Sequence, residues 1–330
     1  MTHGYRGNLL TMITRYARCG KRACTLVSSY SVKDRAQTNT PVITRTYYTP
    51  FCEGESHSGR EHEQSSKIYW TGFLVAGILA ASTEPEEPTK SDDLPPELLE
   101  YLDNLYNTRQ YVVLNNFMQR YTNLNSADVL WRRARVQWEL LKQEGQDYNV
   151  LNRKGRVSQM QELENLIDQA LALDEKNSSA HLWKAILSNA CSTLAGFKKQ
   201  FQNLKTMEYH LRRAINLDPN QAAANTLLGS LYMNLLDMPL LIRVFVNLFW
   251  EMPEEYYYED ALMLFLKAEE VAPKTSIENL FMTGKAYFRL DRTPCAKHYL
   301  ELAMAQPVVT NEDQAFLEEA KQFYKTNFKS

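Results

Sequence analysis

The sequence predicts an all-α fold: a tetratricopeptide-like α-solenoid of about four to five helix pairs with one inserted helix, preceded by a disordered leader and a short apolar segment. Residues 210–232 have the pattern of a helix, a tight turn and a second helix, with apolar side chains at i, i+3 and i+4. The pattern recurs around Ala170, Ala214, Ala268 and Ala303, at spacings of 44, 54 and 35 residues. Tetratricopeptide repeats have a period of about 34 residues, so the first two spacings contain insertions.

Two glycines in this pattern predict close contact between helices. Pro219 ends the first helix of residues 210–232, and Gly229 lies in the middle of the second. A glycine inside a helix costs about 1 kcal/mol relative to alanine. We therefore expect a neighbouring helix to approach Gly229 closely, and Gly284 holds the equivalent place in the third copy.

Charge and cysteine content exclude several classes of protein. The net charge of −2 is unevenly distributed, because residues 84–330 contain 27 basic and 34 acidic residues, about −7. A domain of this charge does not suit nucleic acid, so no nucleic-acid partner is expected. The five cysteines have no zinc-site spacing, and their odd number argues against a complete disulfide framework. Reduced thiols in a cytosol-facing or matrix-type compartment are expected.

The N-terminal region predicts targeting. Residues 1–66 form a disordered basic leader, and the first 33 residues contain no acid. An apolar face set against arginines, with no acids, is typical of a mitochondrial transit peptide, and the alternative is an ordinary basic tail.

Residues 67–83 are a candidate membrane anchor. The uncharged run of 16 residues, 68–83, is just shorter than the roughly 17–25 that span a bilayer. A buried helix or a re-entrant segment is the alternative. The candidate anchor residues are Ile68, Trp70, Phe73, Leu74, Ile78 and Leu79.

An acidic, proline-rich linker at residues 84–96 precedes the solenoid at residues 97–330. The apolar periodicity predicts helices over residues 94–106, 109–121, 127–142, 158–173, 179–197, 203–217, 222–236, 254–271, 277–290, 294–305 and 311–327. The inserted segment, residues 240–250, is unusually apolar. It is either an extra helix packed on the core or an element that plugs the groove, caps the solenoid, touches a membrane or binds a partner.

No catalytic motif is present, so we expect no enzyme, no cofactor and no metal. His181, His210 and His298 are expected to pack or form hydrogen bonds. One candidate partner-binding surface is a basic patch suited to tubulin's acidic tails or to anionic lipid, and the alternative is a solvated face. A second is the groove lined by the inner helices. The patch consists of Arg132, Arg133, Arg135, Arg153, Lys154 and Arg156, and the groove candidates are Thr226, Ser230, Met233, Phe281 and Lys285, with Glu278 beside them.

Residues of about 95–321 resemble the regulator of microtubule dynamics family. The inserted module between Gly229 and Glu259 separates this family from generic tetratricopeptide proteins. The matching residues are Leu130, Trp131, Arg132, Ala134 and Arg135; His181, Trp183, Ala185 and Ile186; His210, Ala214, Ile215, Leu217 and Pro219; Gly229, Met238, Pro239, Arg243, Phe249 and Pro253; Glu259, Ala261, Leu262, Phe265, Ala268 and Glu269; and Asn279, Leu280, Gly284, Lys285 and Tyr287.

The resemblance implies a microtubule-associated protein that acts at the spindle or, as in members with an N-terminal anchor, at mitochondria. The linker lacks the paired aromatic residues of an endoplasmic-reticulum tethering tract. The first hypothesis is therefore a non-enzymatic scaffold that binds microtubules or tubulin, located at mitochondria or alternatively in the cytoplasm, at the spindle and at spindle poles. The second is a mitochondrial, membrane-anchored solenoid that holds a lipid or a peptide in its groove.

Overall fold

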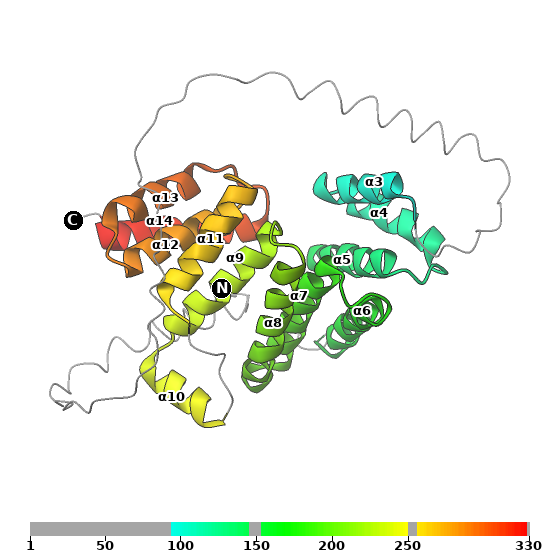
Figure 1. Ribbon diagram of the computed structural model, residues 1–330, viewed down its shortest axis with the longest axis horizontal. Helices are drawn as coiled ribbons and strands as arrows, with labels where there is room; N and C mark the ends of the chain where they lie inside the picture. The colour runs from blue at the N-terminus through cyan, green and yellow to red at the C-terminus, as the bar shows by residue number, and fades with distance from the viewer. Residues whose placement is uncertain (1–93, 145–152, 250–255, 329–330) are drawn as a thin grey trace, which may run out of the picture. The chain divides into compact units, whose positions relative to one another are not determined.

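The computed structural model describes residues 94–144, 153–249 and 256–328, and the ordered elements of these ranges are helices (Figure 1). In chain order they are α3 (Pro96–Asn107), α4 (Tyr111–Met118), the 3-10 turn η1 (Gln119–Tyr121), α5 (Ala127–Glu144), α6 (Arg153–Leu173), α7 (Ser178–Ala195), α8 (Phe197–Leu217), α9 (Ala222–Leu236), α10 (Leu240–Phe249), α11 (Tyr258–Val271), α12 (Ile277–Arg289), α13 (Thr293–Ala305) and α14 (Asn311–Phe328).

The helices form successive antiparallel pairs. The pairs are α3 with α4, α5 with α6, α7 with α8, α9 with α11 and α12 with α13. Each pair also packs on the next, for example α6 on α7 and α11 on α12. Helix α10 is inserted between the two helices of the fourth pair, and α14 follows the fifth. The predicted solenoid of helix pairs with one inserted helix is confirmed.

The core is divided among neighbouring repeats. One apolar cluster joins α3, α4 and α5, a second joins α5, α6 and α7, and the largest extends from α7 to α14. This division is expected of a solenoid, in which each repeat buries its apolar face only against its neighbours.

Both glycines lie where helices approach closely, as predicted. A Cβ built on Gly229 would lie 2.7 Å from Cε1 of Phe265 in α11. A Cβ on Gly284 would lie 2.8 Å from Cγ of Leu300 in α13 and 3.1 Å from the carbonyl oxygen of Ala296. Carbon atoms normally pack about 3.5–4.0 Å apart, so only glycine allows α9–α11 and α12–α13 to pack at these distances.

Three helix starts differ from the prediction by more than two residues. Helix α8 begins at Phe197 and not at residue 203, because Gly196 has a φ of 102° and reverses the chain within one residue. Helix α6 begins at Arg153 and not at residue 158, so it is five residues longer at its start than the apolar periodicity predicts. Helix α11 begins at Tyr258 and not at residue 254, because the side chain of Asp260 accepts a hydrogen bond from the backbone N–H of Tyr257 and caps the helix there.

The leader (residues 1–66), the candidate anchor (67–83) and the linker up to residue 93 lie outside the described residues, and their assignments stay predictions. Helix α3 begins at Pro96, where the linker was expected to end. Among the helices of the described ranges, none combines the length and the apolar character needed to cross a bilayer.

Candidate functional site

Two arginines of the predicted basic patch are engaged inside the fold. Arg132 donates Nη2–H to Asp103 Oδ2 at 2.7 Å, and Arg135 donates to the other oxygen of the same carboxylate. The Arg135 guanidinium also lies 3.9 Å from the ring centre of Tyr106. Burial alone raises the pKa of Asp103, but the hydrogen bonds and charges of the two arginines outweigh it and lower the pKa. Both arginines are buried and bind α5 to α3.

The other members of the patch stay a prediction. Arg133 on α5 and Arg156 on α6 are half-buried. Arg153 and Lys154 belong to the first turn of α6, and their side chains lie outside the described part of the chain.

A second basic surface, which the sequence reasoning missed, lies on α8. This helix contains five basic residues and a single acid, Glu208, which is buried. Lys198, Lys205 and Arg212 recur every seven residues, or about two helical turns, so they share one face with the exposed ring of Tyr209. We call Lys198, Lys205, Tyr209, Arg212 and Arg213 the α8 stripe. At about 1.5 Å per residue it is roughly 21 Å long.

The composition of residues 197–217 was the signal for this surface. The apolar periodicity predicts a helix that begins at residue 203, which places Lys198 outside it, so the seven-residue spacing is not apparent from the predicted helix. In the structure, Glu208 turns inward, where its Oε1 accepts hydrogen bonds from Tyr232 Oη and Arg212 Nε, both at 2.9 Å. The only carboxylate of α8 therefore points toward α9 and pairs with one cation of the α8 stripe, Arg212.

A histidine pair lies beside the stripe. Nδ1 of His181 is 2.8 Å from Nδ1 of His210, and Nε2 of His181 is 2.9 Å from the carbonyl oxygen of Glu175. Because a carbonyl only accepts, His181 donates Nε2–H to it and, when neutral, accepts at Nδ1 the proton that His210 donates. Burial, reinforced by His181, lowers the pKa of His210 to about 4. Both rings contact Tyr209, so the histidine pair packs against the aromatic residue of the α8 stripe.

The predicted groove residues are enclosed between helices. Thr226 on α9 donates to Asn279 Oδ1 on α12, and Ser230 on α9 donates to Glu278 Oε1, both at 3.0 Å. Phe281 packs against two phenylalanines of α14. All five candidates, Thr226, Ser230, Met233, Phe281 and Lys285, are buried. Burial and nearby carboxylates of α14 raise the pKa of Glu278 to about 7, against the lowering effect of the Ser230 hydrogen bond.

Lys285 belongs to an ion cluster around Asp237, the residue that ends α9. Asp237 accepts from Lys285 Nζ at 2.7 Å, Arg289 Nε at 2.8 Å and Tyr258 Oη at 2.9 Å. The cluster joins α9, α11 and α12 at the point where the inserted helix leaves. Although burial alone raises the pKa of Asp237, the two cations lower it.

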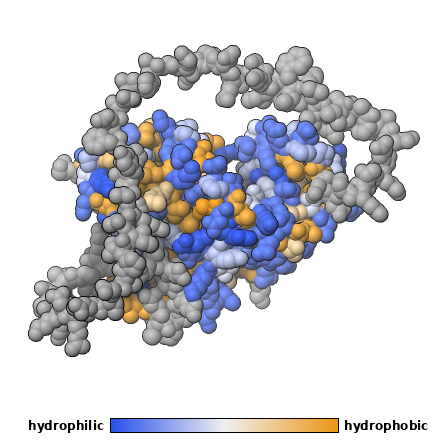
Figure 2. Space-filling model, in the orientation of Figure 1, coloured by the Kyte–Doolittle hydropathy of each residue, from blue (hydrophilic) through white to orange (hydrophobic). Residues whose placement is uncertain are grey.

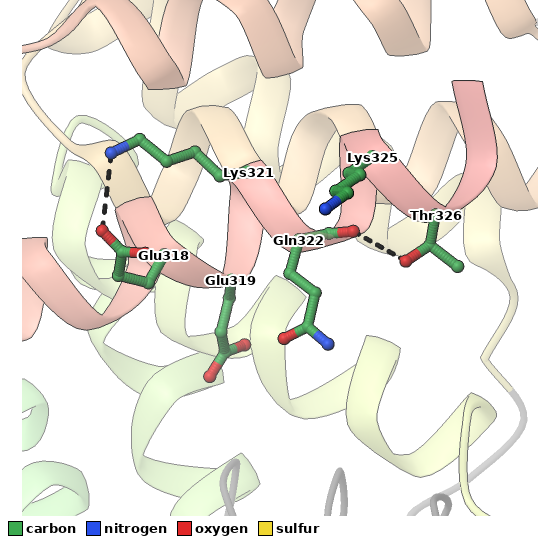
Figure 3. A pocket seen from close by; sticks show the side chains of 6 residues that line it. All are labelled: Glu318, Glu319, Lys321, Gln322, Lys325 and Thr326. Atoms are coloured by element: carbon green, nitrogen blue, oxygen red, sulfur yellow. Dashed lines mark hydrogen bonds and ion pairs between the residues drawn. The ribbon is translucent and has the colours of Figure 1, made fainter. Parts of the chain in front are cut away.

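A shallow pocket of about 700 Å³ lies along α14 (Figure 3). Its lining mixes acidic, basic and polar side chains, and two of them pair with each other, since Lys321 Nζ lies 3.4 Å from Glu318 Oε1. Within residues 94–144, 153–249 and 256–328, no group of three or more histidine, cysteine or acidic side chains could hold a metal ion.

Comparison with known proteins assigns the family. The family model of regulator of microtubule dynamics protein 1-3 matches residues 98–327. Regulator of microtubule dynamics protein 1 of Mus musculus is 30% identical over 260 residues, which cover 78% of this chain and 81% of that protein. Regulator of microtubule dynamics protein 3 of Rattus norvegicus is 30% identical over 193 residues, which cover 57% of this chain and 39% of that protein.

Among solved structures, the chain is similar to TTC0263, a thermophilic TPR protein of Thermus thermophilus. The TM-score is 0.45 at 14% identity, covering 68% of this chain and 97% of that one. The family model covers more than half of this chain and extends from within α3 to within α14. The chain therefore belongs to the regulator of microtubule dynamics protein family.

Proposed function

We propose that this protein is a non-enzymatic scaffold that binds microtubules, and that the α8 stripe contacts the acidic surface of tubulin. Membership of the regulator of microtubule dynamics family carries the proposal, because relatives over most of the chain bear that name. The α8 stripe supplies a surface of the right charge. Its cations are spaced along one exposed helix face, and an extended acidic peptide could follow such a row.

Residues 84–330 are acidic as a whole, which opposes binding to acidic tubulin, but the local charge of α8 is basic. Electrostatic attraction between exposed groups is screened beyond about 8–10 Å at physiological salt, so a tubulin tail responds to the charges nearest to it. The five basic residues of α8 outnumber its one acid, which is turned inward and pairs with Arg212.

Co-sedimentation of the full chain with microtubules tests the proposal. The double variant Lys198→Glu/Lys205→Glu is expected to weaken binding roughly tenfold, since each reversed charge changes the free energy by about 0.5–1 kcal/mol. Lys321→Glu/Lys325→Glu on α14 is the matched control, because it changes the net charge equally and is expected to bind normally (Figure 3).

Three outcomes separate the alternatives. Loss of binding in the α8 variant alone supports the α8 stripe. Loss in Arg133→Glu/Arg156→Glu alone would move the contact to the predicted basic patch on α5 and α6. If wild-type protein does not co-sediment even at low salt, the microtubule proposal itself is wrong.

The alternative function, a lipid or a peptide held in the groove, has less support because the groove candidates are occupied by contacts between α9, α12 and α14. For location we propose mitochondria, directed by residues 1–83, with the cytoplasm and the spindle as the alternative. Imaging of tagged full-length protein beside a form without residues 1–83 distinguishes them: a mitochondrial full-length form with a diffuse truncation supports targeting, and spindle decoration by both forms contradicts it.

A further inference from the structure

Helix α10 exposes an apolar face that no described helix covers. Leu240 is 71% exposed, Leu241 84% and Val244 58%. At 100° per residue these three side chains lie on one side of the helix, while Ile242 and Val246 face the opposite side and pack on the core. Figure 1 shows α10 set apart from the neighbouring helices, and it packs extensively on none of those described.

The exposed face carries no charge. Helix α10 contains no acidic residue, and its only charged side chain, Arg243, is turned away. Arg243 donates Nη2–H to the carbonyl oxygens of Leu235 at 3.0 Å and Leu236 at 2.6 Å, which belong to the last turn of α9. The arginine therefore fastens α10 to α9 by its inner side and leaves the face of Leu240, Leu241 and Val244 without charge. Figure 2 shows a small orange area at the place of α10.

We propose that α10 inserts its outer face into the surface of a lipid bilayer. The exposed face comprises three side chains, whereas a specific protein interface uses roughly 20–30 residues on each side, so α10 is too small for a stable dimer contact. A bilayer requires no matching surface. It accepts a helix that lies in the interface plane with apolar side chains about 5–10 Å deep. The same chain carries the uncharged run of residues 68–83, which could hold the domain near a membrane.

The proposed contact is distinct from the microtubule contact. Insertion through uncharged side chains does not depend on anionic lipid and is insensitive to salt, whereas binding through the α8 stripe weakens as salt rises. The two contacts can therefore be tested independently, and a negative result for one does not contradict the other.

Hydrogen exchange of the full chain, with and without phosphatidylcholine vesicles, tests the proposal. Exchange of the amide hydrogens of residues 243–246 is expected to slow at least about tenfold with vesicles, which corresponds to about 1.4 kcal/mol. Because the measurement is local to α10, binding elsewhere in the chain does not affect it. The variant Leu241→Asp/Val244→Asp is expected to lose this protection while keeping the thermal stability of the wild type.

Val112→Asp/Val113→Asp on α4 is the matched control, since these valines are 60% and 51% exposed and their replacement should leave α10 protected. Absence of protection by vesicles overturns the proposal, as does protection that survives in the α10 variant. Protection that rises with protein concentration in the absence of vesicles also overturns it, because it would assign the face to a second copy of the chain.

Discussion

The contact between α12 and α13 makes a quantitative prediction for Gly284→Ala. The added Cβ would lie 2.8 Å from Cγ of Leu300 and 3.1 Å from the backbone oxygen of Ala296. Leu300 and Ala296 are fully buried, so neither has free space to move into. Overpacking of this kind costs about 1–3 kcal/mol, and alanine returns about 1 kcal/mol of helix propensity. Because the backbone oxygen cannot rotate away, we expect a net loss of about 1–2 kcal/mol.

Thermal unfolding of the full chain, followed by circular dichroism, measures this loss. For a domain of about 150–250 residues, each kcal/mol lowers the Tm by roughly 2–4 °C, so the expected decrease is about 2–8 °C. The control is Gly155→Ala in the first turn of α6, where the glycine is exposed. That replacement should leave the Tm unchanged or raise it slightly. An equal or higher Tm for Gly284→Ala would refute the argument that close helix approach requires this glycine.

Three further predictions concern buried charges. Asp237→Asn leaves the buried Lys285 without its carboxylate, so urea unfolding should show a free energy of unfolding that is lower by about 2–3 kcal/mol. The control is Lys267→Met, which breaks the exposed pair with Glu270 and should lower it by under about 0.5 kcal/mol. Similar losses in the two variants would contradict the role of burial. The pKa of His210 is lowered to about 4, so as the pH falls this side chain is protonated in the unfolded chain before it is protonated in the folded one. Stability therefore falls between about pH 6.5 and pH 4, by about 1–2 kcal/mol once the charge interactions are discounted for screening by water. His210→Phe should remove that slope in urea titrations from pH 7 to 5, and an unchanged slope would assign it to other groups. The pKa of Glu278 is raised to about 7, so this carboxyl ionises at lower pH in the unfolded chain, and stability falls as the pH rises from about 4.5 to 7. Glu278→Gln should therefore be more stable than the wild type at pH 8, by about 1–2 kcal/mol. Equal stability of the two proteins at pH 8 would show that Glu278 ionises normally.

Local patterns sufficed for the helices and for their pairing. The sequence predicts a helix over residues 222–236, which are the bounds observed for α9, because Pro219 and Pro239 flank a periodic apolar segment. Gly229 and Gly284 indicated close approach for the same kind of reason: a glycine inside a helix has a cost that only packing offsets. The family could also be predicted from the sequence, since its inserted module is a contiguous stretch of residues.

The partners and the exposure of the charged residues could not be predicted from the sequence. The sequence lists Arg132, Arg135 and Lys285 as cations but does not say which carboxylate each one meets, because Asp103 and Asp237 come from other helices. Pairing across helices turned two arginines of the predicted patch inward. Glu208, the one acid of α8, is buried and pairs with Arg212, so the remaining charges of α8 are basic. Helix periodicity is a local property that the order of residues determines, whereas the exposure of a charge depends on the partner that folding places beside it, and that was settled only when the helix pairs packed together.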